Sequence, residues 1–289
     1  MQLRRIGRRE VGAIGLGEMP MSIEGRPGEG QSIETIHAAL DAGMTLIDTA
    51  DAYSLGGDDT GHGESLVAKA LSLWGGDRGS VLVATKGGHV RPGDGSWTVN
   101  GDPGYLRRAA EASLRRLGVE AIGLYQYHRP DPKVRYEDAV GVFKELLDAG
   151  KVEMVGISNA NVRQIDIARS VLGEGNLASV QNQFSPSSRF SEAELDYCGE
   201  LGIAFLPWSP LGGIGNAEAL HREHPGFAQV AAGLGVPIQQ VVLAWMLAKG
   251  DHVIPIPGAS RVASARSSAA AAELKLSEDE LSVLDEDRP

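Results

Sequence analysis

The sequence predicts an α/β protein, specifically a (β/α)8 TIM barrel of parallel strands, and three observations favour this fold. Short aliphatic and β-branched runs recur along the chain and alternate with longer segments that have apolar residues at helical spacing. The alternation continues over roughly 250 residues, the usual length of such a barrel. Polar residues or glycine follow most of the strand-like runs. In a barrel, the carboxyl ends of all the strands surround one mouth.

The apolar runs predict eight strands. They cover residues 11–17, 45–49, 81–85, 122–127, 153–157, 178–181, 203–206 and 253–256. Parallel strands need long crossover connections, and these are right-handed in nearly all proteins. The long segments between the runs meet that requirement.

Eight helices are predicted from the segments with helical spacing. They cover residues 32–43, 63–74, 104–118, 136–150, 161–173, 191–202, 237–250 and 260–272. Several begin near a Ser, Asn or Asp that can cap the first turn. Several end at a glycine, which tolerates the left-handed conformation of a helix C-terminus.

An open, doubly wound sheet is the alternative to the barrel. That fold binds dinucleotides at a G-x-G-x-x-G turn between an early strand and its helix. Gly15 and Gly17 supply the first two glycines, but Pro20 occupies the third position. The barrel is therefore favoured.

The bulk properties predict one domain that spans residues 1–289. With 289 residues, of which 42% are hydrophobic, the chain can bury a large core. The longest apolar run, VVLAWMLA, is far shorter than the ~20 residues needed to cross a bilayer, and the first residues lack the apolar region of a signal peptide. Cys198 is the only cysteine, so an intrachain disulfide is impossible. We therefore expect a cytoplasmic protein without a membrane partner.

Charge and histidine spacing argue against two further classes of protein. The net charge of −11 disfavours binding to nucleic acid, which requires clustered basic residues. The densest basic cluster, Arg4, Arg5, Arg8 and Arg9, is expected on a solvated hairpin. No HxH or HxxxH pair occurs, so no metal site is predicted. The sequence does not indicate an oligomeric state.

Four residues at the ends of predicted strands suit carbonyl reduction. They are Asp48, Tyr53, Lys86 and His128. A phenol has a pKa of about 10, so Tyr53 holds a proton at neutral pH and can act as a general acid. A nearby Lys86 ammonium is expected to lower the pKa of Tyr53, and Asp48 to keep that ammonium charged. His128 is expected to donate a hydrogen bond to the substrate carbonyl.

The chain resembles the aldo-keto reductase family over nearly its whole length. The motifs IDTADAY, ATKGG, YQYHRPD, VGISN, SVQNQFSP, LPWSPLGG and IPIPGAS occur in the family's order. The resemblance implies a barrel closed at its base by an N-terminal hairpin, here residues 2–14. It also implies NADPH as cofactor without a Rossmann domain, with NADH less favoured, and aldehydes or ketones as substrates, reduced reversibly to alcohols by hydride transfer.

The resemblance further implies a set of cofactor contacts. Ser158, Asn159 and Gln181 would bind the nicotinamide carboxamide, and Trp208 would stack on the ring. The pyrophosphate would lie against Ser209, Pro210, Leu211, Gly212 and Gly213. The adenosine end would lie against Ile256, Pro257, Gly258, Ala259, Ser260, Arg261 and Arg266. Arg261 would contact the 2′-phosphate and so select NADPH. The family's usual Glu-Asn pair for adenine is replaced by Ser267 and Ser268.

The substrate pocket is expected to include Met19, Met21 and Trp97, beside Tyr53 and His128. Trp97 lies in a long Gly- and Pro-rich loop after Lys86. The sequence lacks the long C-terminal loop of several family members, so we expect an open mouth and broad or bulky carbonyl substrates. A second function stays open. Potassium-channel β-subunits share the fold and hold NADPH with slow turnover, as redox-sensing interaction proteins.

Overall fold

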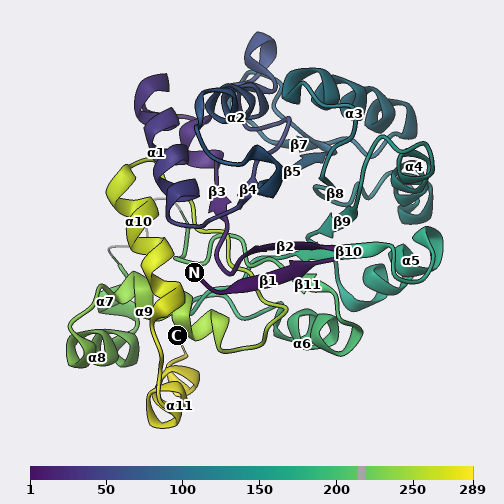
Figure 1. Cartoon of the computed structure of the whole chain (residues 1–289). Coiled ribbons are helices and arrows are strands. Elements are labelled where there is room, and N and C mark those ends of the chain that lie inside the picture. Colours follow the sequence, from purple (N-terminus) through teal and green to yellow (C-terminus); the bar gives the residue numbers. More distant parts are fainter. Residues whose placement is uncertain (214–218, 289) are drawn as a thin grey trace.

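Parallel strands form the centre of the protein in the computed structural model, which describes residues 1–213 and 219–288. Seven of them make one sheet in the order β11-β10-β9-β8-β5-β4-β3, and every neighbouring pair is parallel. Their bounds are β3 (Leu16–Gly17), β4 (Leu46–Asp48), β5 (Leu82–Gly87), β8 (Leu124–Tyr127), β9 (Val155–Ser158), β10 (Leu177–Gln181) and β11 (Ala204–Phe205). Helices surround the sheet on its outside (Figure 1).

The segment 253–258 closes the sheet into a barrel by bonding to both of its edge strands. The Ile254 N–H donates to the Phe205 carbonyl at 2.8 Å, and the Gly17 N–H donates to the Pro257 carbonyl at 2.9 Å. Pro255 and Pro257 have no N–H, so this segment makes only part of a regular ladder. The predicted eighth strand is therefore present as an irregular one, and the predicted barrel is confirmed.

An N-terminal hairpin, β1 (Leu3–Ile6) and β2 (Arg9–Gly12), lies across the ring of strands (Figure 1). Ile6 and Val11 are fully buried and pack against side chains from inside the barrel, such as Leu46. The hairpin therefore covers the base of the barrel, as the sequence predicts. The predicted strand 11–17 is divided, because its first two residues belong to the hairpin and only its last two to β3.

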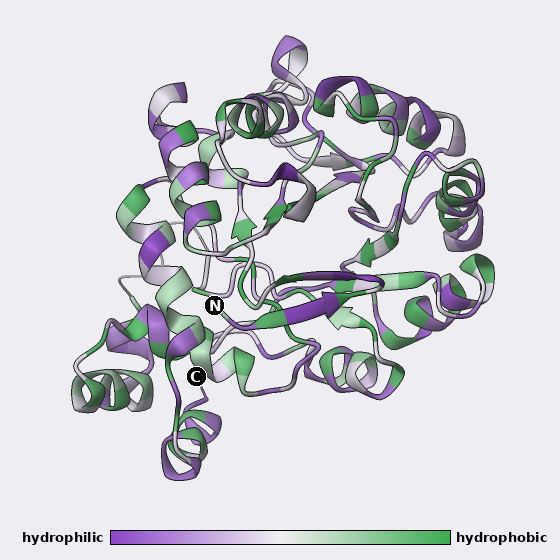
Figure 2. Cartoon of the chain, viewed as in Figure 1, coloured by the Kyte–Doolittle hydropathy of each residue, from purple (hydrophilic) through white to green (hydrophobic). Residues whose placement is uncertain are grey.

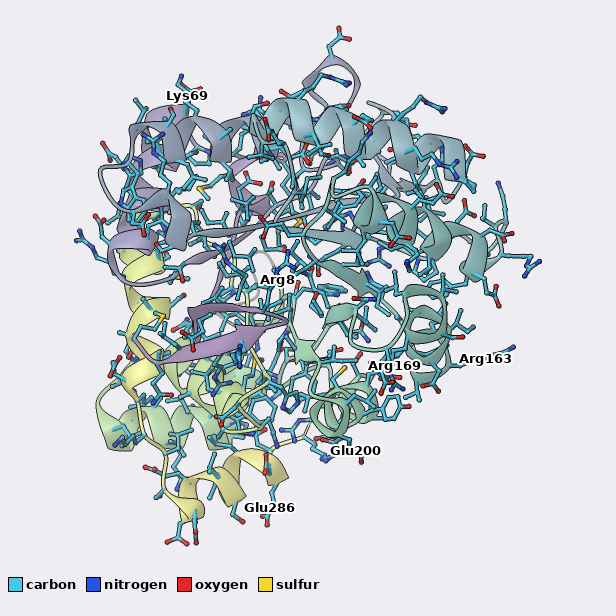
Figure 3. The ribbon with its side chains drawn as sticks, turned by 45° about the vertical axis from the view of Figure 1, so that its right-hand side comes forward. Arg8, Lys69, Arg163, Arg169, Glu200 and Glu286 are labelled. Carbon is cyan, nitrogen blue, oxygen red and sulfur yellow. The ribbon has the colours of Figure 1, made fainter. Side chains whose placement is uncertain are left out.

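Helices follow the barrel strands as the alternation predicts. Their bounds are α1 (Glu29–Asp41), α2 (His62–Leu73), α3 (Pro103–Leu117), α4 (Tyr136–Asp148), α5 (Val162–Leu172), α6 (Glu192–Leu201), α9 (Ile238–Leu247) and α10 (Val262–Ala270). Each carries both hydrophobic and polar residues (Figure 2), and the residues it buries are mainly hydrophobic, such as Ile165, Ala168 and Leu172 of α5. Lys69, Arg163, Glu200 and Glu286 accordingly point away from the molecule (Figure 3).

Several elements were not predicted from the sequence. They are α7 (Leu220–Glu223), α8 (Pro225–Leu234), α11 (Glu278–Glu286), the small hairpin of β6 (His89–Val90) and β7 (Thr98–Val99), and the 3-10 turns η1 (Met19–Met21), η2 (Gly57–Asp59), η3 (Arg78–Ser80) and η4 (Ala271–Glu273). A signal for α11 is visible in retrospect. Ser277 caps the Glu280 N–H, and the Glu280 side chain accepts from the Ser277 N–H, which is a capping box.

Among the described residues, no single helix is both long and apolar enough to span a bilayer. The pair α8 and α9 passes that test when the two helices are taken together, but a bend of 102° separates them. Most residues of α9 are buried, and both helices contribute to the largest core cluster.

Candidate active site

Lys86 connects the residues expected to form the active site. Its Nζ donates to Asp48 Oδ2 at 2.6 Å, to the Thr49 carbonyl at 2.8 Å and to Tyr53 Oη at 3.0 Å. Asp48 and Lys86 lie at the carboxyl ends of the adjacent strands β4 and β5, whose parallel register brings the two side chains together. Lys86 is fully buried and Tyr53 is 8% exposed. The phenol and the ammonium therefore meet at one end of the barrel, as predicted.

Two glutamine side chains hold the other oxygen of Asp48. Gln181 Nε2 donates to Asp48 Oδ1 at 2.8 Å, and Gln126 Nε2 donates to the same oxygen at 3.2 Å. Both glutamines are buried inside the barrel. They satisfy the buried carboxylate and fix its orientation toward Lys86.

The surroundings of Lys86 and Tyr53 determine their protonation. Burial opposes the charge of Lys86, but Asp48 and Tyr53 outweigh it, so the pKa of Lys86 is raised and the ammonium form is retained. Burial also disfavours the charged form of Tyr53 and so raises its pKa. Lys86 lowers this pKa, but the net direction is upward. Lys86 therefore lowers the pKa of Tyr53, as expected, but in the protein alone the desolvation of the phenolate is the larger effect.

His128 lies beside Tyr53, and its imidazole is neutral. Its side chain is 7% exposed, and its Nδ1 has no hydrogen-bond partner among the described residues. Burial first, and then the positive charges of Lys86 and Arg129, hold the pKa of His128 well below its usual range. A neutral imidazole still carries one N–H that can donate to a carbonyl oxygen.

Trp97 lies at the edge of the same site. The tip of the β6–β7 hairpin places it against His89, with ring centroids 4.7 Å apart, and His89 in turn lies 4.8 Å from the His128 ring. The Arg91 guanidinium lies 4.4 Å from the Trp97 ring and forms an ion pair with Glu24 from the loop after β3. These contacts attach the hairpin to the barrel beside the predicted pocket.

The two methionines expected in the pocket occupy different environments. Met19 is half-buried. Met21 is fully buried in a core cluster with Ile14, Leu16 and Ile36. The expectation that Met21 lines the pocket therefore fails, because it has no exposed surface to offer a substrate.

The residues expected at the nicotinamide end lie at the ends of β9, β10 and the segment after β11, next to the tetrad of Asp48, Tyr53, Lys86 and His128. Ser158 Oγ donates to the Gln181 carbonyl at 2.7 Å, and Asn159 Nδ2 donates to the His128 carbonyl at 2.9 Å. Asn159 has a positive φ of 55°. Trp208, at the end of the β11 segment, is half-buried, and its Nε1 has no partner among the described residues.

The expected pyrophosphate segment is a tight turn after β11. Ser209, Gly212 and Gly213 have positive φ values of 49°, 85° and 101°. A left-handed serine is strained, and such strain is concentrated at functional sites. In the segment that closes the barrel, Ile256, Pro257 and Ala259 are buried, whereas Gly258 is exposed. The carbonyl of Ser260, which follows this segment, accepts a hydrogen bond from Gln31 Nε2 at 2.7 Å.

The two arginines expected at the adenosine end both lie on or next to α10. Arg261 is its N-cap residue and Arg266 lies within it, and both side chains are exposed. Neither guanidinium forms a hydrogen bond or ion pair with another residue in ranges 1–213 and 219–288. Ser267 Oγ accepts from Gln240 Nε2 at 3.2 Å, and Ser268 is 7% exposed.

Sequence reasoning missed four residues near the site, namely Glu18, Gln126, His89 and Arg129. A signal existed for Gln126, because a glutamine inside a buried strand must find polar partners. Arg129 follows His128 and lies 5.9 Å from the Trp208 ring, without a hydrogen bond or ion pair to any described residue. Cavities of about 480 and 610 Å³ lie near Arg9 and Arg8, and neither contains a residue of the tetrad.

Comparisons with known proteins agree on one family. The model of the aldo/keto reductase family matches residues 13–287. An uncharacterised oxidoreductase from Schizosaccharomyces pombe is 34% identical over 287 residues, which is 98% of this chain and 89% of that protein.

Solved structures show the same relationship. A thermostable aldo-keto reductase crystallised with the inhibitor epalrestat superimposes with a TM-score of 0.82 and 29% identity, covering 99% of both chains. The glycerol dehydrogenase of Gluconobacter oxydans gives 0.81 and 26%, covering 98% of this chain and 94% of that one. An aldo/keto reductase from Klebsiella pneumoniae, solved with NADP and acetate, gives 0.80 and 27%, covering 99% and 96%. This chain therefore belongs to the aldo/keto reductase family of oxidoreductases.

Proposed function

We propose that this protein is an NADPH-dependent reductase of aldehydes or ketones in which Tyr53 is the general acid. One observation carries the proposal. A single buried ammonium, Lys86 Nζ, contacts both the Asp48 carboxylate and the Tyr53 hydroxyl, while the ring of a neutral His128 lies beside the phenol. This combination provides a proton donor, a positive charge to stabilise its phenolate, and a second hydrogen-bond donor.

The residues beside the tetrad have the chemistry that a nicotinamide dinucleotide needs. Trp208 presents an aromatic face, and its unpartnered Nε1 indicates a polar group still to be bound. The amide oxygen of Asn159 could accept a hydrogen bond from a carboxamide, while Asn159 Nδ2 and the Ser158 hydroxyl donate to backbone carbonyls and hold this end of β9 in place. The left-handed turn at Gly212 and Gly213 has no Cβ at either glycine, so a pyrophosphate could approach its backbone closely. In the Klebsiella pneumoniae neighbours the cofactors in the crystals are NADP and NADPH.

Arg261 supports NADPH over NADH as the cofactor. Its guanidinium is exposed at the first turn of α10, where the helix dipole also favours an anion. No described residue neutralises it, so its charge is available for a 2′-phosphate. Arg266, one turn further along α10, is available for the same group or for the adenine.

The chemical step follows from the positions of three side chains. When bound, the reduced nicotinamide would supply a hydride to the carbonyl carbon. Tyr53 would donate its proton to the carbonyl oxygen, and Lys86 would stabilise the phenolate that remains. His128 would donate a hydrogen bond to the same oxygen as negative charge develops there. The reverse sequence, with Tyr53 as base, would oxidise an alcohol.

Arg129 suggests which carbonyl compounds fit. It is a cation without an ion-pair partner among the described residues, next to His128 and near the Trp208 ring. Trp97 and His89 add flat ring surface to the same site. We therefore expect a preference for aromatic or otherwise bulky carbonyl substrates that carry a carboxylate.

The proposed function is tested by loss of absorbance at 340 nm when NADPH is mixed with the protein and an aromatic aldehyde. The variant Tyr53→Phe removes the transferable proton and keeps the ring, so it should abolish turnover while the Kd for NADPH stays the same. A wild-type protein that binds NADPH but turns over no carbonyl would favour the redox-sensing role instead. Unchanged turnover in Tyr53→Phe would remove Tyr53 from the mechanism.

A further inference from the structure

A buried carboxyl lies directly behind the proposed active site. Glu18 follows β3 and has no exposed surface. Its carboxyl accepts one hydrogen bond from Ser22 Oγ and another from Thr49 Oγ1 at 2.8 Å. The backbone carbonyl of the same Thr49 accepts from Lys86 Nζ at 2.8 Å. One residue therefore connects the Glu18 carboxyl to the ammonium that contacts Tyr53.

The surroundings of Glu18 balance its charged and neutral forms. Burial has the largest effect and raises the pKa, whereas the hydroxyl donors of Ser22 and Thr49 and the charge of Lys86 lower it, and the result is about 7. A Cβ added at Gly63 would lie only 2.4 Å from Glu18 Oε2, so this oxygen lies against the first turn of α2. The helix N-terminus also favours the ionised form.

Ser22 connects this carboxyl to a residue near the surface. Its Oγ, which donates to Glu18 Oε1, lies 2.8 Å from His62 Nδ1. His62 is half-buried at the start of α2. Burial and the nearby Arg26 lower the pKa of His62, although Asp59 opposes them, so the imidazole is neutral at pH 7 and can accept a proton. When Glu18 passes its proton to Ser22 Oγ, the hydroxyl passes its own proton to His62, and solvent removes it.

We propose that Glu18 is a positioning residue that exchanges a proton through Ser22 and His62 and thereby sets the charge behind Tyr53. This inference rests on the proposed carbonyl reduction. Ionised Glu18 adds a negative charge near the phenol, which makes Tyr53 a weaker acid. Neutral Glu18 removes that charge and leaves Lys86 and Asp48 as a balanced pair.

The other ionisable groups around Glu18 come from each element packed against it. They are Asp48 of β4, Lys86 of β5, Tyr53 of the loop after β4 and His62 of α2, and Arg26, paired with Asp59, lies against Ser22 and His62. Lys86 stays protonated and His62 stays neutral around pH 7. Glu18 is therefore the member of this group that changes charge in that range.

The experiment compares the pH profiles of kcat/KM for an aromatic aldehyde, from pH 5 to 9, in the wild type and in Glu18→Gln. Glutamine has the shape of the neutral acid, and the Ser22 and Thr49 hydroxyls can reorient to bond with it. We expect wild-type kcat/KM to fall up to roughly tenfold as the pH rises through about 7, and this step to be missing in the variant. Glu34→Gln, an equal charge change at an exposed site on α1, should keep the step.

A second variant leaves the carboxyl in place and covers the case in which Glu18→Gln does not fold. Thr49→Val removes a hydrogen bond to the ionised carboxyl, so the midpoint of the step should move to higher pH. A step that is equal in the wild type and Glu18→Gln, or a midpoint that Thr49→Val leaves unchanged, would overturn the proposal.

Unfolding in urea gives a readout that does not depend on turnover. A carboxyl whose folded pKa is raised stabilises the protein fully below its unfolded pKa of about 4.5 and loses that contribution as the pH rises through about 7. The free energy of unfolding of the wild type should therefore fall relative to that of Glu18→Gln between pH 5 and 8. If the enzyme is active but the free energy of unfolding shows no such pH-dependent difference, only the role of Glu18 is refuted. If the difference is found but the protein reduces no carbonyl, the proposed function is refuted, whereas the titration of Glu18 is supported.

Discussion

The rings of Tyr53 and His128 meet edge to face, with centroids 5.7 Å apart and planes at 81°. Tyr53 comes from the loop after β4 and His128 follows β8, so two groups that are 75 positions apart in the sequence are neighbours in space. Lys86 lies against Tyr53, with its Nζ 4.7 Å from the centre of the Tyr53 ring. A carbonyl oxygen placed between the phenol and the imidazole could accept a hydrogen bond from each.

The imidazole is expected to act on kcat rather than on cofactor binding. His128→Phe keeps a flat ring but removes the N–H, so kcat should fall roughly 100-fold, the usual loss for one donor to a developing oxyanion. The Kd for NADPH, measured by fluorescence titration, should stay the same. His221→Phe alters an exposed histidine on α7 and should change neither quantity. A normal kcat in His128→Phe would exclude this role.

The guanidinium of Arg261 is expected to bind the 2′-phosphate of NADPH. In Arg261→Ala the Kd for NADPH should rise at least tenfold, since a charge-assisted contact contributes about 1.5–3 kcal/mol. The Kd for NADH should change little, because NADH lacks that phosphate. Arg163→Ala, on the exposed face of α5, serves as the control. Equal losses for the two cofactors would show that Arg261 does not discriminate between them.

The cation at Arg129 is expected to select substrates by charge. For the wild type, kcat/KM should be higher for 4-carboxybenzaldehyde than for benzaldehyde. Arg129→Met should lower the first value roughly tenfold, since it removes a charge-assisted hydrogen bond, and leave the second almost unchanged. A uniform loss for both aldehydes would point to a structural role, and no preference in the wild type would contradict the expectation.

Arg4 is expected to stabilise the barrel rather than the chemistry. Although it belongs to the basic cluster, it is 7% exposed and donates to the backbone carbonyls of Leu247, Gly250 and Val253. Arg4→Met leaves these carbonyls without a donor and should lower the free energy of unfolding by about 2–3 kcal/mol, measured in urea. Arg5→Met, next to it and exposed, should cost less than about 0.5 kcal/mol. Similar losses in the two variants would contradict this assignment.

The burial of Arg4 could not be predicted from the sequence. A cluster of four arginines indicated a solvated hairpin, and the hairpin is present, but alternation along β1 turns Arg4 inward while Arg5 faces solvent. The number of charged residues in a segment does not indicate which face of a strand each of them occupies. Met21 was misplaced for the same reason, because methionine suits a pocket and a core equally well until its neighbours are known.

The sequence by itself determined the order of the barrel strands and their eight surrounding helices, the hairpin and the family, because periodicity and motifs are properties of consecutive residues. It also identified the four residues that the strand ends bring together. Only the tertiary structure decided the balance of charges at the site. Burial depends on distant segments, and it outweighs Lys86 at Tyr53, keeps His128 neutral and raises the pKa of Glu18. Desolvation is set by everything packed around a group, and no local pattern of residues records it.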